Sequence, residues 1–532
     1  MEGDNNRLKK IVTVAGTTML SRVLGLVRDM LTAALLGLTA TASAFFFAFT
    51  IPNLFRRLLG EGALTSVFIP VLSDELQAHG KSGAFRFANT VLSWLVVVLV
   101  GLVGMSVVLL AVVAGWLQTV KDTGLEAEQL EQWRLGCWLG ACLMPYMLFI
   151  CLAAVFSAAL NVLERFAVPA FSPVLLNLAM IAALVIAGIG LDLPIDTVVL
   201  YLCWGVLLGG VLQLLLPMTA LMRLGWRPAV DFSRSQRLQQ LLRLFLPGVV
   251  GAAVAQVNVL VSRLLAFQLN ASAVAALFYA NRLVELPLGI FTIAITTVFF
   301  PRLSRLASAR EEVGLQTVYA QGIRLVLAIT VPAMVGLIVL REPILRLLFE
   351  WQAFSAADVA ETDPLLLCYA AALPFYSLST FVSRGFHSLQ DTRTPVRIAM
   401  VAFGVNLVGS LIGMQWLGTL GLALANMLAA IVQSLLLHYA LKSKGAHFRA
   451  IRYGQAVSRI LIAAAVMGLF AWGGAEGMSH FLADGKALQL GVVVVVIPLA
   501  VMLYFAVLML LKFEDMSALL GLLRARRSAR AV

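Results

Sequence analysis

Long apolar stretches alternate with short polar segments along most of the chain. Two of them, residues 91–115 and 488–511, contain no charged residue and exceed the roughly 20 residues that an α-helix needs to cross a bilayer. We expect about fourteen crossings, centred near residues 25, 50, 103, 147, 182, 208, 256, 286, 332, 375, 407, 430, 466 and 500. The alternating pattern of membrane β-barrel strands does not recur. The pattern predicts an all-α polytopic membrane protein.

Composition supports this class. Of 532 residues, 61% are hydrophobic and 12% charged, with a mean hydropathy of +0.95, which excludes a single water-soluble core. The N-terminus has no short apolar region followed by a small-residue cleavage site, so we expect no cleaved signal peptide. The five cysteines lie in apolar segments and the five histidines lack ligand spacing. We therefore expect no disulfide framework, no metal site and no cofactor.

The net charge of +12 raises the question of nucleic-acid binding, which depends on where the basic residues lie. They are dispersed over short loops and a C-terminal tail, without base-stacking aromatics, so nucleic acid is not expected. One connection carries Arg223, Arg227, Arg234, Arg237 and Arg243. A second, at residues 118–134, is mainly acidic. The positive-inside rule then places both termini and the basic connection in the cytoplasm.

An internal repeat relates the two halves of the chain. TSVFIPVLS at residues 65–73 and TTVFFPRLS at residues 296–304 are identical at six of nine positions. Two copies with the same orientation predict two six-helix lobes around a central cavity, plus two C-terminal helices, although two loop entries sharing a proline and a few apolar residues would also match. The predicted division is 1–222 (N-terminal lobe), 223–243 (basic cytoplasmic linker), 244–441 (C-terminal lobe), 455–511 (additional helix pair) and 512–532 (basic cytoplasmic tail).

Charged side chains inside the predicted crossings are the strongest functional signal, because such charges are costly in lipid and normally face a cavity or a partner. They are Arg22, Arg28, Asp29, Arg56, Arg57, Glu61, Arg263, Arg282 and Glu285. The spacing predicts ion pairs between Arg57 and Glu61 and between Arg282 and Glu285. Six arginines against three acids leave a positive excess, and arginine suits bidentate capture of phosphate. We favour an anion-binding cavity over structural pairing or placement at helix ends.

Seven segments resemble the MurJ (MviN) family in order and approximate spacing. They are SRVLGLVRD, AFFFAFTIPNLFRRLLGEGALTSVFIPVLS, ALNVLERFAVPAFSPVLLNL, GGVLQL, FYANRLVELP, LLFEWQAFSAAD and GFHSLQDTRTPVR. This family belongs to the multidrug, oligosaccharidyl-lipid and polysaccharide exporter superfamily. The resemblance implies a flippase in the bacterial inner membrane that translocates lipid II, the undecaprenyl-pyrophosphate-linked disaccharide pentapeptide, by alternating access. Membrane lipids and cell-wall synthesis proteins are the further partners it suggests.

The resemblance also assigns roles to individual residues. It implies substrate-binding arginines at Arg22, Arg28, Arg56 and Arg282, with Arg57 and Glu61 in the same essential segment. Crossings 13 and 14 would form a groove for the polyprenyl tail. Where relatives commonly have acidic residues, this chain has Ser43 and Asn281. Both replacements remove negative charge, weaken a model that requires carboxylates there, and leave Asp29, Glu61 and Glu285 as the acidic gating or coupling candidates. Ser43, Asn281 and Arg263 complete the candidate set.

Other functions compete with this interpretation. A flippase for O-antigen or exopolysaccharide lipids has the same physical needs, and only the family-specific segments separate it. A drug or cation exporter would favour acidic or aromatic cavity residues. An enzyme would need clustered carboxylates or a histidine nucleophile, whereas the adjacent acidic pairs at 74–75, 311–312 and 514–515 lack a third ligand. A non-transporting scaffold could use the arginines of the tail to bind anionic lipid or protein, although they also fit a positive-inside flank.

Overall fold

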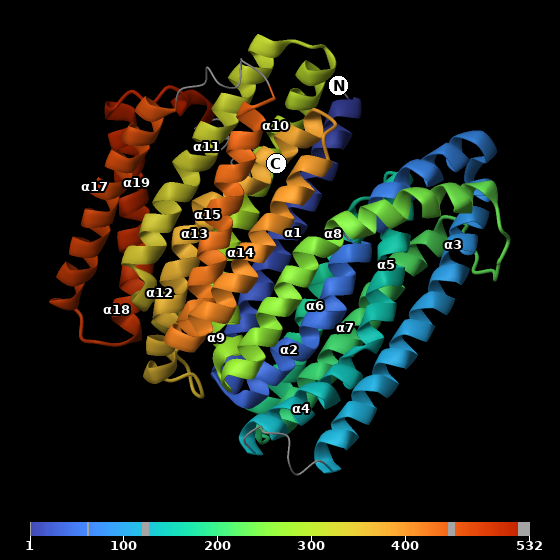
Figure 1. Ribbon diagram of the computed structural model, residues 1–532, viewed down its shortest axis with the longest axis horizontal. Coiled ribbons are helices and arrows are strands. Elements are labelled where there is room, and N and C mark those ends of the chain that lie inside the picture. The colour runs from blue at the N-terminus through green and yellow to red at the C-terminus, as the bar shows by residue number, and fades with distance from the viewer. Residues whose placement is uncertain (1, 61–62, 120–126, 445–452, 520–532) are drawn as a thin grey trace. The chain divides into compact units, whose positions relative to one another are not determined.

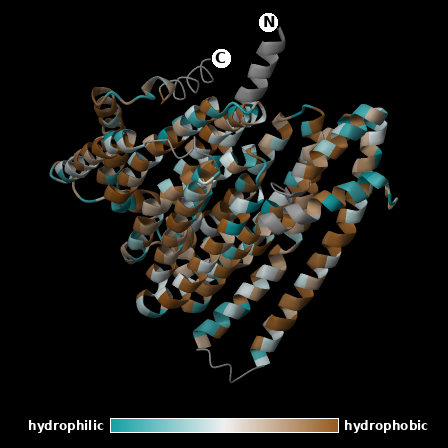
Figure 2. Ribbon diagram, turned by 45° about the horizontal axis from the view of Figure 1, so that its top comes forward, coloured by the Kyte–Doolittle hydropathy of each residue, from teal (hydrophilic) through white to brown (hydrophobic). Residues whose placement is uncertain are grey.

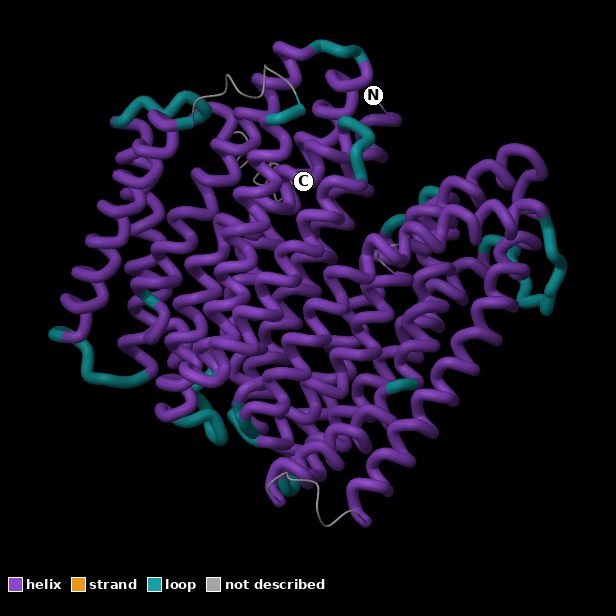
Figure 3. The backbone as a smooth tube through the Cα atoms, in the orientation of Figure 1, coloured by secondary structure: helices purple, strands orange, loops and turns teal. Residues whose placement is uncertain are grey.

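The computed structural model describes residues 2–60, 63–119, 127–444 and 453–519, all of which are helix or loop, without a strand (Figure 3). This confirms the all-α class. The chain separates into two packed units, Met1–Ala275 (unit 1) and Ala276–Val532 (unit 2). Each unit is described by itself below.

Unit 1 contains eight α-helices and two π-helical segments within its described residues (Figure 1). These are α1 (Glu2–Leu36), α2 (Ala40–Phe55), η1 (Arg56–Gly60), α3 (Ala63–Thr119), α4 (Ala127–Leu143), α5 (Pro145–Val162), α6 (Ala167–Leu184), η2 (Val185–Gly190), α7 (Ile195–Arg223) and α8 (Gln236–Leu269). The side chains of Thr39 and Ser235 cap α2 and α8 by accepting hydrogen bonds from backbone N–H groups. Gly80, with a φ of 65°, allows the sharp bend inside α3.

Apolar side chains hold unit 1 together. Helix α6 packs between α1 and α7, while α5 contacts both α7 and α3. Phe45, Phe68 and Tyr146 are among its fully buried large side chains. Hydrophobic residues dominate the middle of the helices and polar residues gather toward their ends and the loops (Figure 2). This distribution suits helices whose outer surface meets lipid.

Unit 2 is built mainly from long helices packed around a second apolar core. In chain order its elements are α9 (Ala273–Pro287, whose first turn belongs to unit 1), η3 (Leu288–Thr292), α10 (Ile293–Ser308), α11 (Glu312–Val339), α12 (Arg341–Leu348), α13 (Ala356–Ser388), α14 (Arg393–Leu417), α15 (Thr419–Lys442), α17 (Gly454–Ser479), α18 (Lys486–Gly491), η4 (Val492–Val496) and α19 (Ile497–Leu510). Helices α14 and α15 approach closely where Gly421 faces Gly413: a Cβ on Gly421 would lie 2.1 Å from the Gly413 carbonyl oxygen. Only glycine fits there.

Eleven helices or helix pairs within the described residues are long and apolar enough to cross a membrane. The protein is therefore a multi-pass membrane protein, but the expected count of about fourteen is not confirmed. The predicted crossings near residues 25, 50 and 256 fall in α1, α2 and α8, which are outside the eleven, and α2 has only 16 residues.

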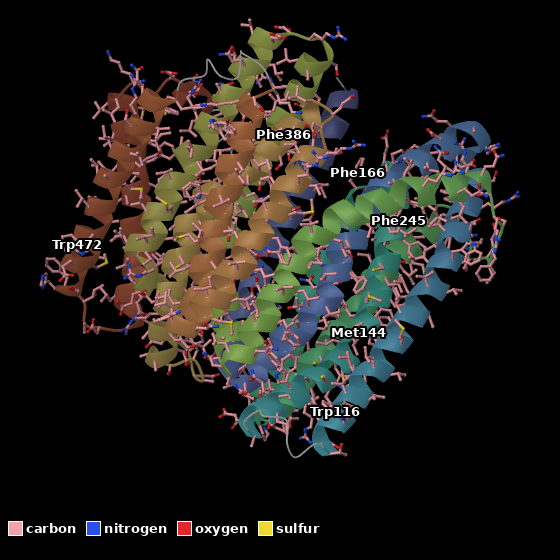
Figure 4. The ribbon with its side chains drawn as sticks, viewed as in Figure 1. Trp116, Met144, Phe166, Phe245, Phe386 and Trp472 are labelled. Atoms are coloured by element: carbon pink, nitrogen blue, oxygen red, sulfur yellow. The ribbon has the colours of Figure 1, made fainter. Side chains whose placement is uncertain are left out.

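Trp116 and Trp472 are 56% and 62% exposed, and Trp472 lies on the side of α17 that faces away from the other helices of unit 2 (Figure 4).

The predicted lobe boundaries differ from the boundary between the packed units. Helix α8 was expected to open the C-terminal lobe, yet it packs on α3 and α2 inside unit 1. Residues 455–511 span α17, α18, η4 and α19 with the loop between α17 and α18, and α17 packs on α11. A packing unit and a transport lobe need not share a boundary, so the five-part division stays a prediction.

Two π-helical segments occupy corresponding places in the internal repeat. The segment η1 begins nine residues before Thr65, and η3 begins eight residues before Thr296, the first residues of the two repeat copies. Pro52 precedes η1 and Pro287 precedes η3. π-Helical turns are rare and concentrate at functional sites. Their recurrence supports the internal repeat independently of the six identical positions.

Candidate functional site

The first candidate cluster surrounds Arg28 on α1. Its Nε and Nη2 atoms lie 2.9 and 2.6 Å from Asp29 Oδ1, and the residue Asp29 is only 1% exposed. Arg28 Nη1 also donates a hydrogen bond to Asn177 Oδ1 of α6 over 3.0 Å. The Asn177 amide in turn donates to the Ser21 carbonyl oxygen over 3.0 Å. Asn177 was not among the residues predicted from the sequence, because the sequence of an apolar helix does not reveal which distant residue its asparagine contacts.

The other arginines of unit 1 that were predicted to bind substrate lie in η1 and on α1. Arg56 is half-buried, and its Nε donates a hydrogen bond to Asn53 Oδ1 over 2.8 Å. Arg57 is exposed, and Arg22 on α1 is half-buried. Glu61, and with it the predicted Arg57–Glu61 pair, lies outside the described residues.

Ser43 and Arg263 both bind the backbone at the start of α9. The fully buried Ser43 Oγ accepts a hydrogen bond from the Ala275 N–H over 3.3 Å. Arg263 Nη1 donates to the Val274 carbonyl oxygen over 2.9 Å. These contacts fix the turn between α8 and α9. The gating roles expected for the two residues stay predictions.

The candidate cluster of unit 2 is centred on Glu285 of α9. Its Oε2 lies 3.1 Å from Arg282 Nη1, which confirms the ion pair predicted from the i, i+3 spacing. Its Oε1 accepts a hydrogen bond from Asn281 Nδ2 over 3.2 Å. Asn281 thus donates a hydrogen bond at a position where, according to the resemblance, relatives commonly have a carboxylate. One carboxylate holds two neighbouring polar side chains.

The arginines expected to bind substrate are divided between the units. Arg22, Arg28, Arg56 and Arg57 belong to unit 1, and Arg282 belongs to unit 2. Each group places guanidinium donors, which can bind an anion, next to carboxylate or amide groups that hold them in position. Their convergence on one central cavity stays a prediction. Among the described residues, no group of three or more His, Cys, Asp or Glu side chains could hold a metal ion.

Asp391, in the segment GFHSLQDTRTPVR, fixes the start of α14. Its Oδ1 accepts hydrogen bonds from the N–H groups of Arg393 and Thr394, and its Oδ2 lies 2.8 Å from Lys444 Nζ. Burial raises the pKa of Asp391, but the Lys444 ammonium and the Thr394 hydrogen bonds outweigh it and hold that pKa well below its usual range. This segment is therefore a helix cap that ties α14 to the end of α15.

The segment LLFEWQAFSAAD binds the start of α18. Lys486 Nζ donates hydrogen bonds to the carbonyl oxygens of Arg346 and Glu350. The same ammonium lies 4.5 Å from the ring centroid of Trp351, a cation–π contact. Lys486 therefore links the start of α18 to the C-terminal end of α12 and the residues that follow it in unit 2.

Comparison with known proteins identifies the relatives of this chain. The family model described as lipid II flippase MurJ matches residues 32–492. A probable lipid II flippase MurJ of Vibrio cholerae is 35% identical over 522 residues, covering 96% of this chain and 98% of the relative. The corresponding protein of Rhizobium tropici is 32% identical, with 98% of each chain covered.

Solved structures agree on the fold. A structure of lipid II flippase MurJ in an inward closed conformation matches with a TM-score of 0.75 at 24% identity, covering 95% of this chain and 99% of that one. An inward-facing multidrug resistance transporter of the MATE family, in the MOP superfamily, matches with a TM-score of 0.65 at 16% identity, covering 83% and 100%. From the family match over most of its length and the relatives that span nearly all of it, the chain belongs to the lipid II flippase MurJ family.

Proposed function

We propose that this protein translocates lipid II from the cytoplasmic to the outer leaflet of the bacterial inner membrane by alternating access, as part of peptidoglycan synthesis. The observation that carries the proposal is the family membership over nearly the whole chain. Its relatives are named as lipid II flippases. The described helices provide the membrane-spanning scaffold that such transport needs.

The anionic pyrophosphate of lipid II is the group that the arginines would bind. Arg28 is supported by Asp29 and Asn177, so its guanidinium is held in place without substrate. Arg22, Arg56 and Arg282 would add further donors. Because guanidinium keeps its charge in a low-dielectric site, it can compensate the phosphate charges throughout the cycle.

The carboxylates would hold the arginines while substrate is absent. The Arg282–Glu285 pair at 3.1 Å supports this assignment, since phosphate oxygens could replace the carboxylate oxygens at the same guanidinium. Exchange of Glu285 for pyrophosphate would then release α9 and trigger closure. Glu61 is the corresponding candidate beside Arg57.

The C-terminal helix pair would carry the polyprenyl tail. Exposed apolar side chains on α17 and α19, including Leu469 and Met502, support a lipid-facing surface there. Both termini would lie in the cytoplasm, as the positive-inside pattern predicts. An interior-negative potential would favour outward movement of the anionic head group by about 2.3 kcal/mol per charge per 100 mV. Proteins that use lipid II in cell-wall synthesis would be its partners.

The decisive experiment measures lipid II externalisation in cells depleted of their own flippase and supplied with this protein. Wild type is compared with Arg28→Ala and Arg282→Ala at equal membrane expression. Arg310→Ala, which removes an exposed arginine from the connection between α10 and α11, is the matched control. We expect rescue by wild type and by the control, and loss of rescue in the other two variants.

Each alternative result has a distinct meaning. If well-expressed wild type fails to externalise lipid II, the O-antigen or exopolysaccharide lipid becomes the better substrate. If Arg28→Ala and Arg282→Ala both rescue fully, the arginines do not bind the pyrophosphate and the anion-site assignment is wrong.

A further inference from the structure

The loop at residues 224–235, between α7 and α8, is held firmly against α3 (Figure 1). Trp226 is 3% exposed, and its indole N–H donates a hydrogen bond to Asn89 Oδ1 over 2.8 Å. The Asn89 amide returns a hydrogen bond to the Arg227 carbonyl oxygen over 3.0 Å. Asn89 thus fixes the first part of the loop from both sides.

Asp231 fixes the second part. Its carboxylate accepts hydrogen bonds from the Thr90 hydroxyl over 2.6 Å and from the Ser233 N–H over 2.9 Å. Its own N–H donates to Ser93 Oγ over 3.0 Å. The hydrogen bonds from Thr90 and Ser233 lower the pKa of Asp231, so the carboxylate stays charged at neutral pH.

This ordered loop exposes apolar side chains. Val230 is 81% exposed and Phe232 is 46% exposed, with the Phe232 ring packed edge-on against Trp94 at 5.4 Å. The contacts reach residues 89–94 of α3, where the long apolar run of this helix begins at residue 91. The loop therefore lies beside the first turns of this apolar run. This position corresponds to the membrane–water interface, where aromatic side chains are enriched at the level of the lipid head groups.

Cationic side chains surround these apolar tips. Arg227 and Arg234 of the loop and Arg86 of α3 are exposed, and Arg86 is close enough to Asp231 to affect its ionisation. Asp231 is the one acidic residue of the loop, so three arginines accompany a single carboxylate. An exposed surface with apolar tips inside a cationic rim complements the boundary between acyl chains and anionic phosphates.

We propose that this surface, formed by Arg86, Arg227, Val230, Phe232 and Arg234, is a binding site for anionic phospholipids. Val230 and Phe232 enter the acyl boundary, and the arginines bind the phosphates of the surrounding head groups. Hydrogen bonds to α3 hold the loop in this position. Bound lipid thereby anchors the connection between α7 and α8 at a fixed depth. This role is additional to lipid II transport and does not depend on it.

The first test counts phospholipids retained by the purified full-length protein in detergent, using native mass spectrometry with titrated phosphatidylglycerol or phosphatidylcholine. The double variant Arg227→Gln/Arg234→Gln is compared with Arg302→Gln/Arg310→Gln, which removes two exposed arginines elsewhere. Each arginine near an anionic surface contributes about 1 kcal/mol, so we expect a roughly 30-fold weaker phosphatidylglycerol affinity in the loop variant. The control variant keeps wild-type affinity, and phosphatidylcholine binding changes in neither.

The second test locates the loop in the bilayer. A fluorophore attached at Val230→Cys, in a Cys142→Ala background, is reconstituted in vesicles containing acyl-brominated phosphatidylglycerol. We expect strong quenching at position 230 and little at Gln240→Cys, an exposed site on α8. Equal phosphatidylglycerol affinities of the two double variants, or an unquenched label at position 230, would overturn the proposal. The latter result would point to a protein that covers the loop.

Discussion

Asn177 of α6 accepts a hydrogen bond from Arg28 of α1 over 3.0 Å, although 149 residues separate them in sequence. The amide also donates to the Ser21 carbonyl oxygen, which fixes its orientation with the oxygen toward the guanidinium. Asp29 binds the same guanidinium through Nε and Nη2. Arg28 is therefore held from two sides, which favours tight binding of an anion because little side-chain ordering remains to be done.

Replacing Asn177 by leucine should impair transport by removing one of these two supports. A hydrogen bond to a charged group contributes about 1.5–3 kcal/mol, so we also expect lower thermal stability. Asn177→Asp keeps an acceptor for Arg28 and should retain more lipid II externalisation than Asn177→Leu. The measurements are thermal unfolding in detergent and the externalisation assay. Wild-type transport by Asn177→Leu would show that Asp29 alone positions Arg28.

Glu285 should tolerate loss of its charge better than reversal of its charge. Glu285→Gln preserves an acceptor for Arg282 and Asn281, and because the pair is partly exposed we expect a stability change below about 1 kcal/mol. Glu285→Lys places a cation beside Arg282 and should abolish externalisation at equal expression. Full transport by the lysine variant, alone and combined with Glu61→Lys, would exclude these carboxylates as holders of the arginines.

The contribution of Asp391 to the free energy of unfolding should depend on pH. Because its folded-state pKa lies below the unfolded value of about 3.9, the stabilisation is fully present above that value and is lost as the pH falls through the folded-state pKa. Asp391→Ala should cost about 1–2 kcal/mol at pH 7, since it removes a helix cap and a partner of Lys444. Denaturation of both proteins between pH 3 and pH 7 measures the difference. A difference that does not shrink below about pH 4 would show that the charge is irrelevant.

The sequence predicted what depends on local spacing and composition. The helical class follows from uncharged runs such as residues 91–115, and the Arg282–Glu285 pair follows from their shared helix face. Contacts between distant segments were not predictable from one sequence. The sequence around Asn177 does not indicate a partner, because its contact with Arg28 arises only from the packing of α6 on α1.

Ser43 and Asp391 illustrate the same limit. Ser43 was expected to matter because it replaces a carboxylate, yet its hydrogen bond to the Ala275 N–H emerges only from the packing of α2 beside the α8–α9 turn. Asp391 sits in a family-specific segment, but only the folded chain shows its contact with Lys444. The number of membrane crossings also depends on short helices such as α2. With 16 residues, α2 is shorter than the roughly 20 residues that a crossing needs, so its apolar composition does not establish that it spans the membrane.

The prolines before the two π-helical segments should favour motion at the expense of stability. A proline inside a helix removes a hydrogen bond and costs about 3 kcal/mol relative to alanine. We expect Pro287→Ala to raise the thermal unfolding temperature and slow lipid II externalisation, because a regular α-helix would replace the π-helical segment η3. Pro52→Ala should act likewise at η1. Pro217→Ala, within α7 and away from either segment, is the control and should leave transport unchanged.

Lys486 should stabilise the docking of the C-terminal helices on α12. Lys486→Met retains the aliphatic chain but removes the hydrogen bonds to the Arg346 and Glu350 carbonyl oxygens and the cation–π contact with Trp351, so we expect a loss of about 1–2 kcal/mol. Lys486→Arg keeps the charge and should retain part of the stability. In hydrogen-exchange measurements, we expect Lys486→Met to exchange faster than wild type in α18, while exchange in α14 stays the same in both proteins. Equal exchange in wild type and Lys486→Met would mean that apolar packing of α17 and α19 on α11 holds the helix pair without this contact.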